Sequence, residues 1–200
     1  MKKRVLVSIS REFGSGGHDI GKIVGRKLGI PVYDADLLKK VCEEYGYEYS
    51  DWKAFEETPR SLFLTRTFGE FSSAPQDHVA EMEFRYIEEK INEGNSFVIV
   101  GRCGSKMIKD HNPCVRAFVW ADENFKINRI MRRHNVDNEE AFQMMKKKDR
   151  GRRMYTERFT KGKWDDPKHY DLYMNSSKLG IEATAELLIR YIELEQVSTV

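Results

Sequence analysis

The stretch "SISREFGSGGHDIG", residues 8–21, places glycines, a serine and charged side chains directly after an apolar run. Three glycines and a serine within four residues favour a turn whose backbone N–H groups converge on one point. If a helix follows, its first-turn amides point to the same place, and such an arrangement binds phosphate. The stretch therefore predicts a nucleotide-phosphate site, with a tight turn that holds no ligand as the simpler alternative.

Neither of two common phosphate motifs matches this loop completely. A P-loop, GxxxxGK followed by Ser or Thr, would carry Gly at Arg11 and Lys at Gly17. The dinucleotide fingerprint GxGxxG matches at its first two glycines but has Asp19 in place of the third. Asp34 nevertheless falls about where that fingerprint needs its ribose-binding acid. The loop alone leaves a kinase and a dinucleotide-dependent oxidoreductase both open.

The surrounding pattern predicts the elements that would position this loop. Short apolar runs, rich in β-branched residues, predict five strands, and 3.6-residue spacing predicts helices between them. The strands are expected at 4–10, 30–34, 96–102, 114–121 and within 168–177, and the helices at 18–29, 35–46, 76–92, from 122, at 138–155 and at 180–195. This alternation is typical of an α/β fold, a five-stranded parallel sheet with helices on both faces.

The composition describes one ordinary globular domain. The chain has 200 residues, 33% of them charged, and a net charge of +2, which is too small to indicate nucleic acid or membrane as a partner. Three cysteines without CxxC spacing predict a reducing, cytoplasmic location and no structural metal. No apolar run reaches the ~20 residues that a membrane span needs. A homo-oligomer stays open.

Two segments depart from the repeating pattern. Residues 46–75 have no clean period, so they form either a surface excursion or a flap that closes over a substrate. Residues 122–165 hold many of the lysines and arginines, which predicts either a solvated basic face or a lid that closes on phosphates.

Three stretches of the chain resemble the cytidylate kinase-like family, a divergent branch of the nucleoside monophosphate kinases. They are "ISREFGSGGHDIGKIVGRKLGIPVYDADLL", "VIVGRCG" and "DLYMNSSKLGIEATAELL", and the resemblance spans nearly the whole chain. It implies a three-layer P-loop kinase fold in a single domain over 1–200, with 46–75 as a small substrate-binding insertion and 122–165 as an arginine-rich lid. It also implies transfer of the ATP γ-phosphoryl group to CMP or dCMP with Mg²⁺, and small nucleotides as the partners.

The resemblance assigns an ATP side. The loop that wraps the ATP phosphates would consist of Gly14, Ser15, Gly16, Gly17, His18 and Asp19, with Lys22 about one turn into the helix. Gly17 takes the place of the family's usual lysine. We hypothesise that Arg11, at the start of the loop, partly replaces that lysine, because a guanidinium donates to phosphate oxygens in pairs. A solvated arginine at a strand end is the alternative.

The resemblance also assigns an acceptor side and catalytic lid residues. Asp34 and Lys40 follow the second strand, and Lys40 and Arg102 align with positions that hold the acceptor phosphate. Asp149 and Arg152 have the spacing of the family's substrate-contacting DxxR pair. The lid would supply Arg129, Arg132 and Arg152 to stabilise the transferring phosphoryl charge.

The missing lysine leaves a second function open. A nucleotide-binding protein with a decayed kinase site, acting as a sensor or scaffold, would show the same fold and the same loop. Cys103 replaces the aspartate of the family's "GRD", so any contact made by that carboxylate is lost.

Overall fold

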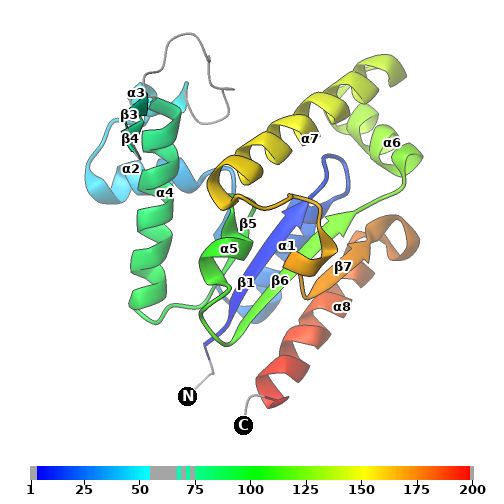
Figure 1. The fold of residues 1–200 in the computed structure, drawn as a ribbon. Helices are drawn as coiled ribbons and strands as arrows, with labels where there is room; N and C mark the ends of the chain where they lie inside the picture. Colours follow the sequence, from blue (N-terminus) through cyan, green and yellow to red (C-terminus); the bar gives the residue numbers. More distant parts are fainter. Residues whose placement is uncertain (1–3, 55–66, 69–70, 73–74, 199–200) are drawn as a thin grey trace. The chain divides into compact units, whose positions relative to one another are not determined.

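The structure is a computed structural model that describes residues 4–54, 67–68, 71–72 and 75–198 (Figure 1). The chain divides into two compact units. We call Met1–Tyr33 with Asn95–Val200 the sheet unit, and Asp34–Gly94 the second unit. Each is described by itself.

The sheet unit is built on five parallel strands, which confirms the predicted sheet. The strands are β1 (Leu6–Arg11), β2 (Val32–Tyr33), β5 (Phe97–Val100), β6 (Cys114–Trp120) and β7 (Leu172–Asn175). Their order in the sheet is β2-β5-β1-β6-β7, so β1 lies at the centre, between β5 and β6. A dinucleotide-binding sheet instead places its second strand beside the first. This order argues against the oxidoreductase alternative.

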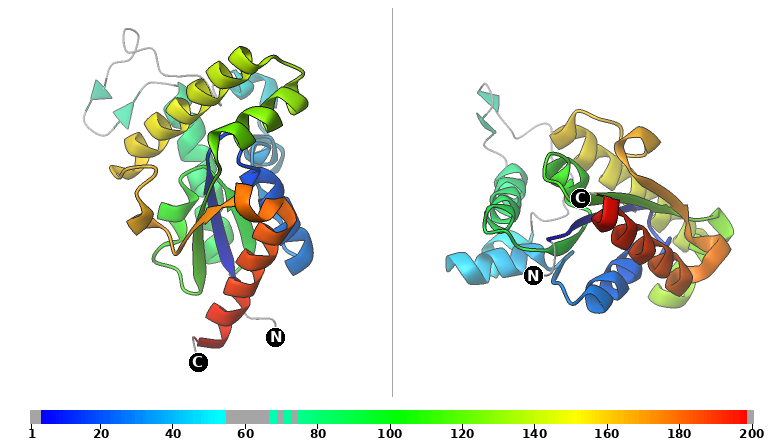
Figure 2. Two further views of the ribbon diagram at one scale, coloured as in Figure 1. Left: turned by 90° about the vertical axis from the view of Figure 1, so that its right-hand side faces the viewer. Right: turned by 90° about the horizontal axis from the view of Figure 1, so that it is seen from below.

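Helices cover both faces of this sheet. On one face, α1 (Gly17–Leu28) lies beside α8 (Ser176–Ser198), which is interrupted at Gly180 (Figure 2). A Cβ on Gly21 of α1 would come within 2.6 Å of Val100. On the opposite face lies α5 (Gly104–Ile108), where a Cβ on Gly104 would come within 2.5 Å of Ile99. Ile99 and Val100, neighbours in β5, thus face helices on opposite sides of the sheet, as strand geometry requires.

The core follows the same alternation along β1. Val7 and Ile9, with Val5 just before the strand, are buried in the cluster that α1 and α8 cover. On the other face Phe118 of β6 packs against Trp164 and Tyr170. Because both faces are buried, the strands are nearly continuous apolar runs, the pattern from which they were predicted.

The remaining helices of the sheet unit are α6 (Glu123–His134), α7 (Asn138–Thr160) and the 3-10 turn η1 (Pro167–His169). Helix α7 ends five residues later than expected, and Tyr155 packs on Phe159 within this extension. Helix α6 starts one residue after the predicted position 122, and the Asp122 carboxylate accepts from Asn175 and does not cap the helix. Helix α5 was not predicted, since five residues are too short to show a helical period.

The second unit contains α2 (Leu37–Tyr45), α3 (Tyr49–Lys53), α4 (Pro75–Asn92) and the antiparallel pair β3 (Thr67–Phe68) and β4 (Phe71–Ser72). Leu38 and Cys42 of α2 form a buried cluster with Val79 of α4. Much of the 46–75 segment lies outside the described residues, so its predicted role as an insertion stays a prediction. Within the described ranges, no helix combines the length and the apolar character needed to cross a membrane.

Candidate phosphate-binding site

The loop after β1 has the backbone shape that its glycines predicted. Gly14 and Gly16 have φ values of +85° and +82°, a left-handed conformation that glycine adopts without strain. Gly16 is the N-cap of α1, and no side chain caps this helix. As in any α-helix, the first-turn amides of α1 have no intrahelical acceptor, and a phosphate at this end would provide one.

The loop glycines are also required for space. A Cβ on Gly14 would lie 2.9 Å from the carbonyl oxygen of Lys126 in α6. A Cβ on Gly16 would overlap Ile181 of α8. The loop is thus packed tightly between two later helices, and this packing by itself requires glycine at both positions.

Arg11, the last residue of β1, runs along two further glycines. A Cβ on Gly17 would lie 2.5 Å from the Cβ of Arg11, and a Cβ on Gly101 would overlap its guanidinium. Gly101, Arg102 and Cys103 all have positive φ, at +83°, +52° and +55°. Such a conformation costs free energy for the two that are not glycine. The fold thereby brings Arg11 and Arg102 to the carboxyl edge of β1 and β5, where α/β proteins bind ligands.

Helix α6 presents its arginines to the first turn of α1. Arg129 pairs with the Asp19 carboxylate, and Arg133 donates to both its oxygens at 3.2 and 3.3 Å. Arg132 bends back and donates to the Asn128 carbonyl of its own helix. The three arginines, with Phe125, Gly180 and Ile181, line an open pocket of about 540 Å³. Three arginines beside the apolar side chains of Phe125 and Ile181 make this pocket suited to an anionic ligand.

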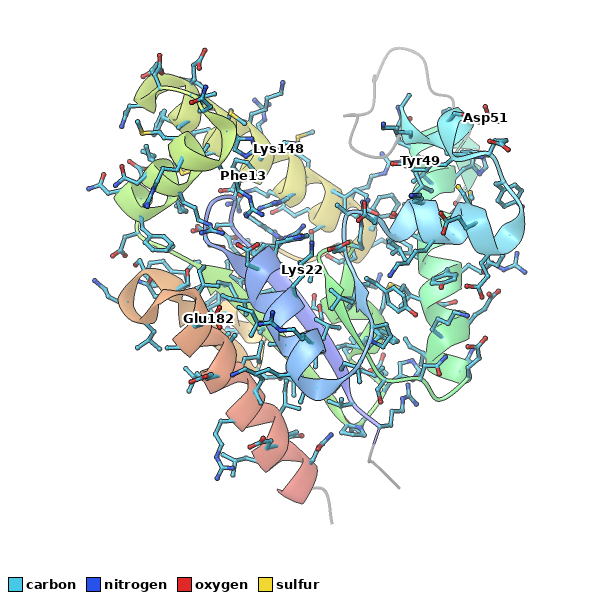
Figure 3. The ribbon with its side chains drawn as sticks, turned by 180° about the vertical axis from the view of Figure 1, so that it is seen from behind. Phe13, Lys22, Tyr49, Asp51, Lys148 and Glu182 are labelled. Carbon is cyan, nitrogen blue, oxygen red and sulfur yellow. The ribbon has the colours of Figure 1, made fainter. Side chains whose placement is uncertain are left out.

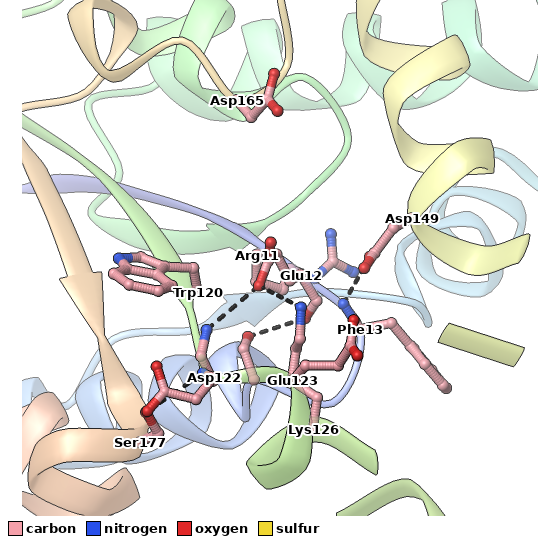
Figure 4. A network of polar contacts seen from close by, with 12 residues as sticks. Arg11, Glu12, Phe13, Trp120, Asp122, Glu123, Lys126, Asp149, Asp165 and Ser177 are labelled. Atoms are coloured by element: carbon pink, nitrogen blue, oxygen red, sulfur yellow. Dashed lines mark hydrogen bonds and ion pairs between the residues drawn. The ribbon is translucent and has the colours of Figure 1, made fainter. Parts of the chain in front are cut away.

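Helix α7 contacts the main chain of the loop. The Oδ1 of Asp149 accepts from the Phe13 amide at 2.7 Å, as Figure 4 shows. The Nη1 of Arg152 donates to the Arg11 carbonyl at 3.1 Å and lies 3.5 Å from the Asp149 carboxylate. Burial raises the pKa of Asp149 to about 6. The two residues expected to contact substrate are therefore brought together, but on the loop backbone.

Sequence reasoning missed three further contacts of the loop. The Glu12 carboxylate accepts from Lys126 at 2.8 Å and from the Ala121 amide at 3.3 Å. Lys126 is only 8% exposed, and a lysine four residues before the buried Ile130 was a usable signal for an inward-facing cation. Ser176 donates its hydroxyl hydrogen to the Ser15 carbonyl at 2.6 Å. Nothing in the local sequence marked that serine.

Four other predicted residues are placed by the elements that carry them. Lys22 is exposed on α1, one turn beyond the loop (Figure 3). Asp34 and Lys40 belong to the second unit. Asp34 is buried and accepts from the Asp36 amide at 3.1 Å, a turn that precedes α2. His18 lies in the first turn of α1. Among the described residues no group of three or more His, Cys, Asp or Glu could hold a metal ion.

Comparisons with known proteins agree with this geometry. A profile of the cytidylate kinase-like family matches residues 6–178. A cytidylate kinase from Archaeoglobus fulgidus is 23% identical over 194 residues, which is 96% of each chain. The crystal structure of an uncharacterized protein from Eubacterium ventriosum is 30% identical, with a TM-score of 0.76 over 95% of this chain and 99% of that one.

A more distant solved structure shows the same fold. Shikimate kinase from Bacteroides thetaiotaomicron is 14% identical, with a TM-score of 0.54 over 94% of this chain and 98% of that one. At this identity the likeness concerns the fold alone. It confirms the expected three-layer arrangement of a P-loop kinase.

Proposed function

The chain belongs to the cytidylate kinase-like family, and we propose that it transfers a phosphoryl group from ATP to CMP or dCMP. The family and the kinase fold support nucleotide-dependent phosphoryl transfer. The observation that carries the proposal is the uncapped start of α1, reached through a glycine loop and faced by Arg129 and Arg133. Amides, a helix N-terminus and arginines at one point are what a polyphosphate requires.

The arginines of α6 are suited to follow the phosphate charge. Arg129 and Arg133 now hold the carboxylate of Asp19, which is an anion at the mouth of the loop. A nucleotide phosphate presents more charge and more acceptor oxygens, so it can take over these donors. Stabilising the charge on the equatorial oxygens is most of the catalysis in phosphoryl transfer. We assign this role to Arg129 and Arg133. Arg132, which was expected to share it, donates to the Asn128 carbonyl here but lines the same pocket, so it stays a candidate. Residues 122–165 are assigned to the lid.

Mg²⁺ fits this site as a companion of ATP. When bound, it would neutralise part of the negative charge of the phosphates. Asp19 is the carboxylate of the first turn of α1, and no described acidic cluster accompanies it. Phosphate oxygens and water would therefore supply most of the metal ligands.

We further propose that Arg11 replaces the lysine that typical P-loops carry at the place of Gly17. The Arg11 stem fills the space in which a side chain at position 17 would begin. A side chain at position 11 therefore requires glycine at position 17. A typical loop has the reverse arrangement, with glycine at the place of 11 and lysine at the place of 17. Arg11 then supplies a cation from the strand end instead of the helix start.

The acceptor side rests on the family resemblance. Arg102 is held at the end of β5 by a backbone of positive φ, and we assign it to the acceptor phosphate. Asp34 and Lys40 are assigned to the acceptor on the same resemblance, and 46–75 to a substrate-binding insertion. The 540 Å³ pocket over Phe125 and Ile181 is assigned to the donor nucleotide.

The proposal is tested by ADP release in a coupled assay across nucleoside monophosphates and other phosphorylated acceptors. We expect acceptor-dependent ADP with CMP or dCMP, and Arg11→Ala to lower kcat by about 10²–10³, the loss typical for one transition-state donor. A different best acceptor would correct the substrate. Unchanged turnover in Arg11→Ala would remove Arg11 from the mechanism.

The decayed-site alternative makes the opposite prediction. It requires that the wild type release no acceptor-dependent ADP, and that restoring the usual loop create activity. Gly17→Lys alone is a poor test, because its Cβ would collide with Arg11. The informative variant is the double change Arg11→Gly with Gly17→Lys, compared with each single change. Activity in the double variant alone would establish decay and refute our proposal.

A further inference from the structure

Asp149 and Arg152 lie one turn apart on α7 and therefore share one helix face. Both reach the main chain on either side of Glu12: Arg152 binds the carbonyl of Arg11, and Asp149 binds the amide of Phe13. Figure 4 shows the Asp149 carboxylate directed at this amide. The pair thus holds two peptide groups that are separated by one residue.

These two bonds set the start of the phosphate loop. The Phe13 amide is turned toward α7, so the glycine turn that follows begins from a fixed orientation. The Arg11 carbonyl is fixed by the same helix, and with it the backbone from which the Arg11 side chain departs. A shift of either bond would move both the amide cradle and the cation that we place beside it.

Asp149 is largely buried beside the loop. Its side chain is 20% exposed, and its Oδ1 accepts from the Phe13 amide and lies 3.5 Å from Nη1 of Arg152. Arg152 also covers the Phe13 ring, with its guanidinium carbon 5.5 Å from the ring centre. Among the other charged groups, Glu12 of the loop raises the pKa of Asp149 and Lys126 of α6 lowers it. The hydrogen bond from Phe13 and the ring contact of Arg152 thus tie α7 to the start of the loop.

We propose that Asp149 and Arg152 form a backbone clamp, a pair of positioning residues that keeps the loop after β1 in its phosphate-binding shape, and that they do not bind the acceptor. The inference rests on the proposed function for the identity of the ligand. It departs from the assignment that the DxxR spacing suggested, because the structure directs both side chains to the donor loop.

The test compares Asp149→Ala and Arg152→Met with Arg150→Ala, an exposed position on the same helix, as the matched control. Binding of ADP and of a non-hydrolysable ATP analogue is measured by calorimetry, so turnover is not needed. We expect each clamp variant to bind about tenfold more weakly, the loss typical of one hydrogen bond to a charged group. The control should match the wild type. In steady-state assays the KM for ATP should rise and kcat should fall, with the acceptor KM unchanged.

A spectroscopic measurement keeps the proposal testable if these variants fold poorly. In the wild type, the amide resonance of Phe13 should shift with pH and report the Asp149 pKa of about 6. Asp149→Asn, which keeps the shape of the side chain, should abolish that titration and weaken nucleotide binding.

Two results would overturn the clamp. One is nucleotide binding at wild-type strength in both Asp149→Ala and Arg152→Met. The other is a rise confined to the acceptor KM, which would restore the substrate-contact role. A wild type that binds ATP but transfers no phosphoryl group would refute the proposed function and leave the clamp measurable.

Discussion

Helices α6 and α7 both reach the loop after β1, and they do so through different chemical groups. Arg129 and Arg133 of α6 hold a side chain, the carboxylate of Asp19. Asp149 and Arg152 of α7 hold main-chain groups of Arg11 and Phe13. The α6 contact is an ion pair in which another anion can replace Asp19. The α7 contacts instead satisfy main-chain groups of the loop itself.

This difference separates two roles that a basic segment of sequence cannot distinguish. Arginines that hold an exchangeable anion can bind a phosphate in its place, so they are candidates for direct catalysis. A carboxylate and an arginine bound to backbone groups have no such freedom, so they support the geometry on which catalysis depends. The lid region predicted at 122–165 therefore contains both kinds of residue on neighbouring helices.

The largest effect is expected from α6. Arg129→Ala should lower kcat by about 10²–10³, because one donor to the transferring charge is lost. The melting temperature should hardly change, since partly exposed ion pairs contribute less than ~1 kcal/mol. Steady-state kinetics and thermal unfolding measure the two quantities, with Arg190→Ala on α8 as a surface control. A large fall in Tm with little fall in kcat would instead give Arg129 a structural role, like that of Asp149 and Arg152 on α7.

The next effect concerns the pH dependence of stability through α7. The pKa of Asp149 is raised by burial to about 6, so the folded protein binds this proton more tightly than the unfolded chain does. Its contribution to the free energy of unfolding is therefore greatest at low pH and declines as pH rises from about 4 to about 6. Asp149→Asn should remove this slope, on the order of 2–3 kcal/mol at most. Urea unfolding of both proteins between pH 4 and pH 7.5 measures it, and parallel curves would contradict the assignment.

A smaller effect should follow from the anion that α6 now holds. Asp19→Asn removes a negative charge beside the expected phosphates and releases Arg129 and Arg133. We expect the KM for ATP to fall by about fivefold, which corresponds to roughly 1 kcal/mol. A loss of kcat that extra Mg²⁺ reverses would instead assign Asp19 to the metal.

The smallest effect is expected on α7 away from the loop. Arg153 pairs with Asp165 through two bonds of 2.8 and 2.9 Å, and both side chains are more than a third exposed. Arg153→Ala should cost less than ~1 kcal/mol of stability and leave kcat unchanged. The kinetics of Arg153→Ala therefore test whether the residues of α7 that support the loop are limited to Asp149 and Arg152. A tenfold fall in kcat would extend the functional face of the helix.

Much of the fold could be predicted because its signals are local. The strands around Val7 and Val98 are buried on both faces, so their apolar runs are visible in sequence. Gly29 ends α1 in a left-handed conformation, as its position suggested. Helix α5 escaped prediction because its five residues are positioned by contact with the sheet, through Gly104 against Ile99.

The candidate site divides in the same way. The sequence by itself determined the glycine turn and the helix after it, because backbone freedom and amide direction follow from local residue types. Only the tertiary structure decided that Arg11 fits where glycine stands at 17 and 101, that Asp19 pairs with α6, and that Asp149 binds the Phe13 amide. These contacts join residues up to 136 positions apart. Their partners are set by how the helices pack around the sheet, and no local pattern records that packing.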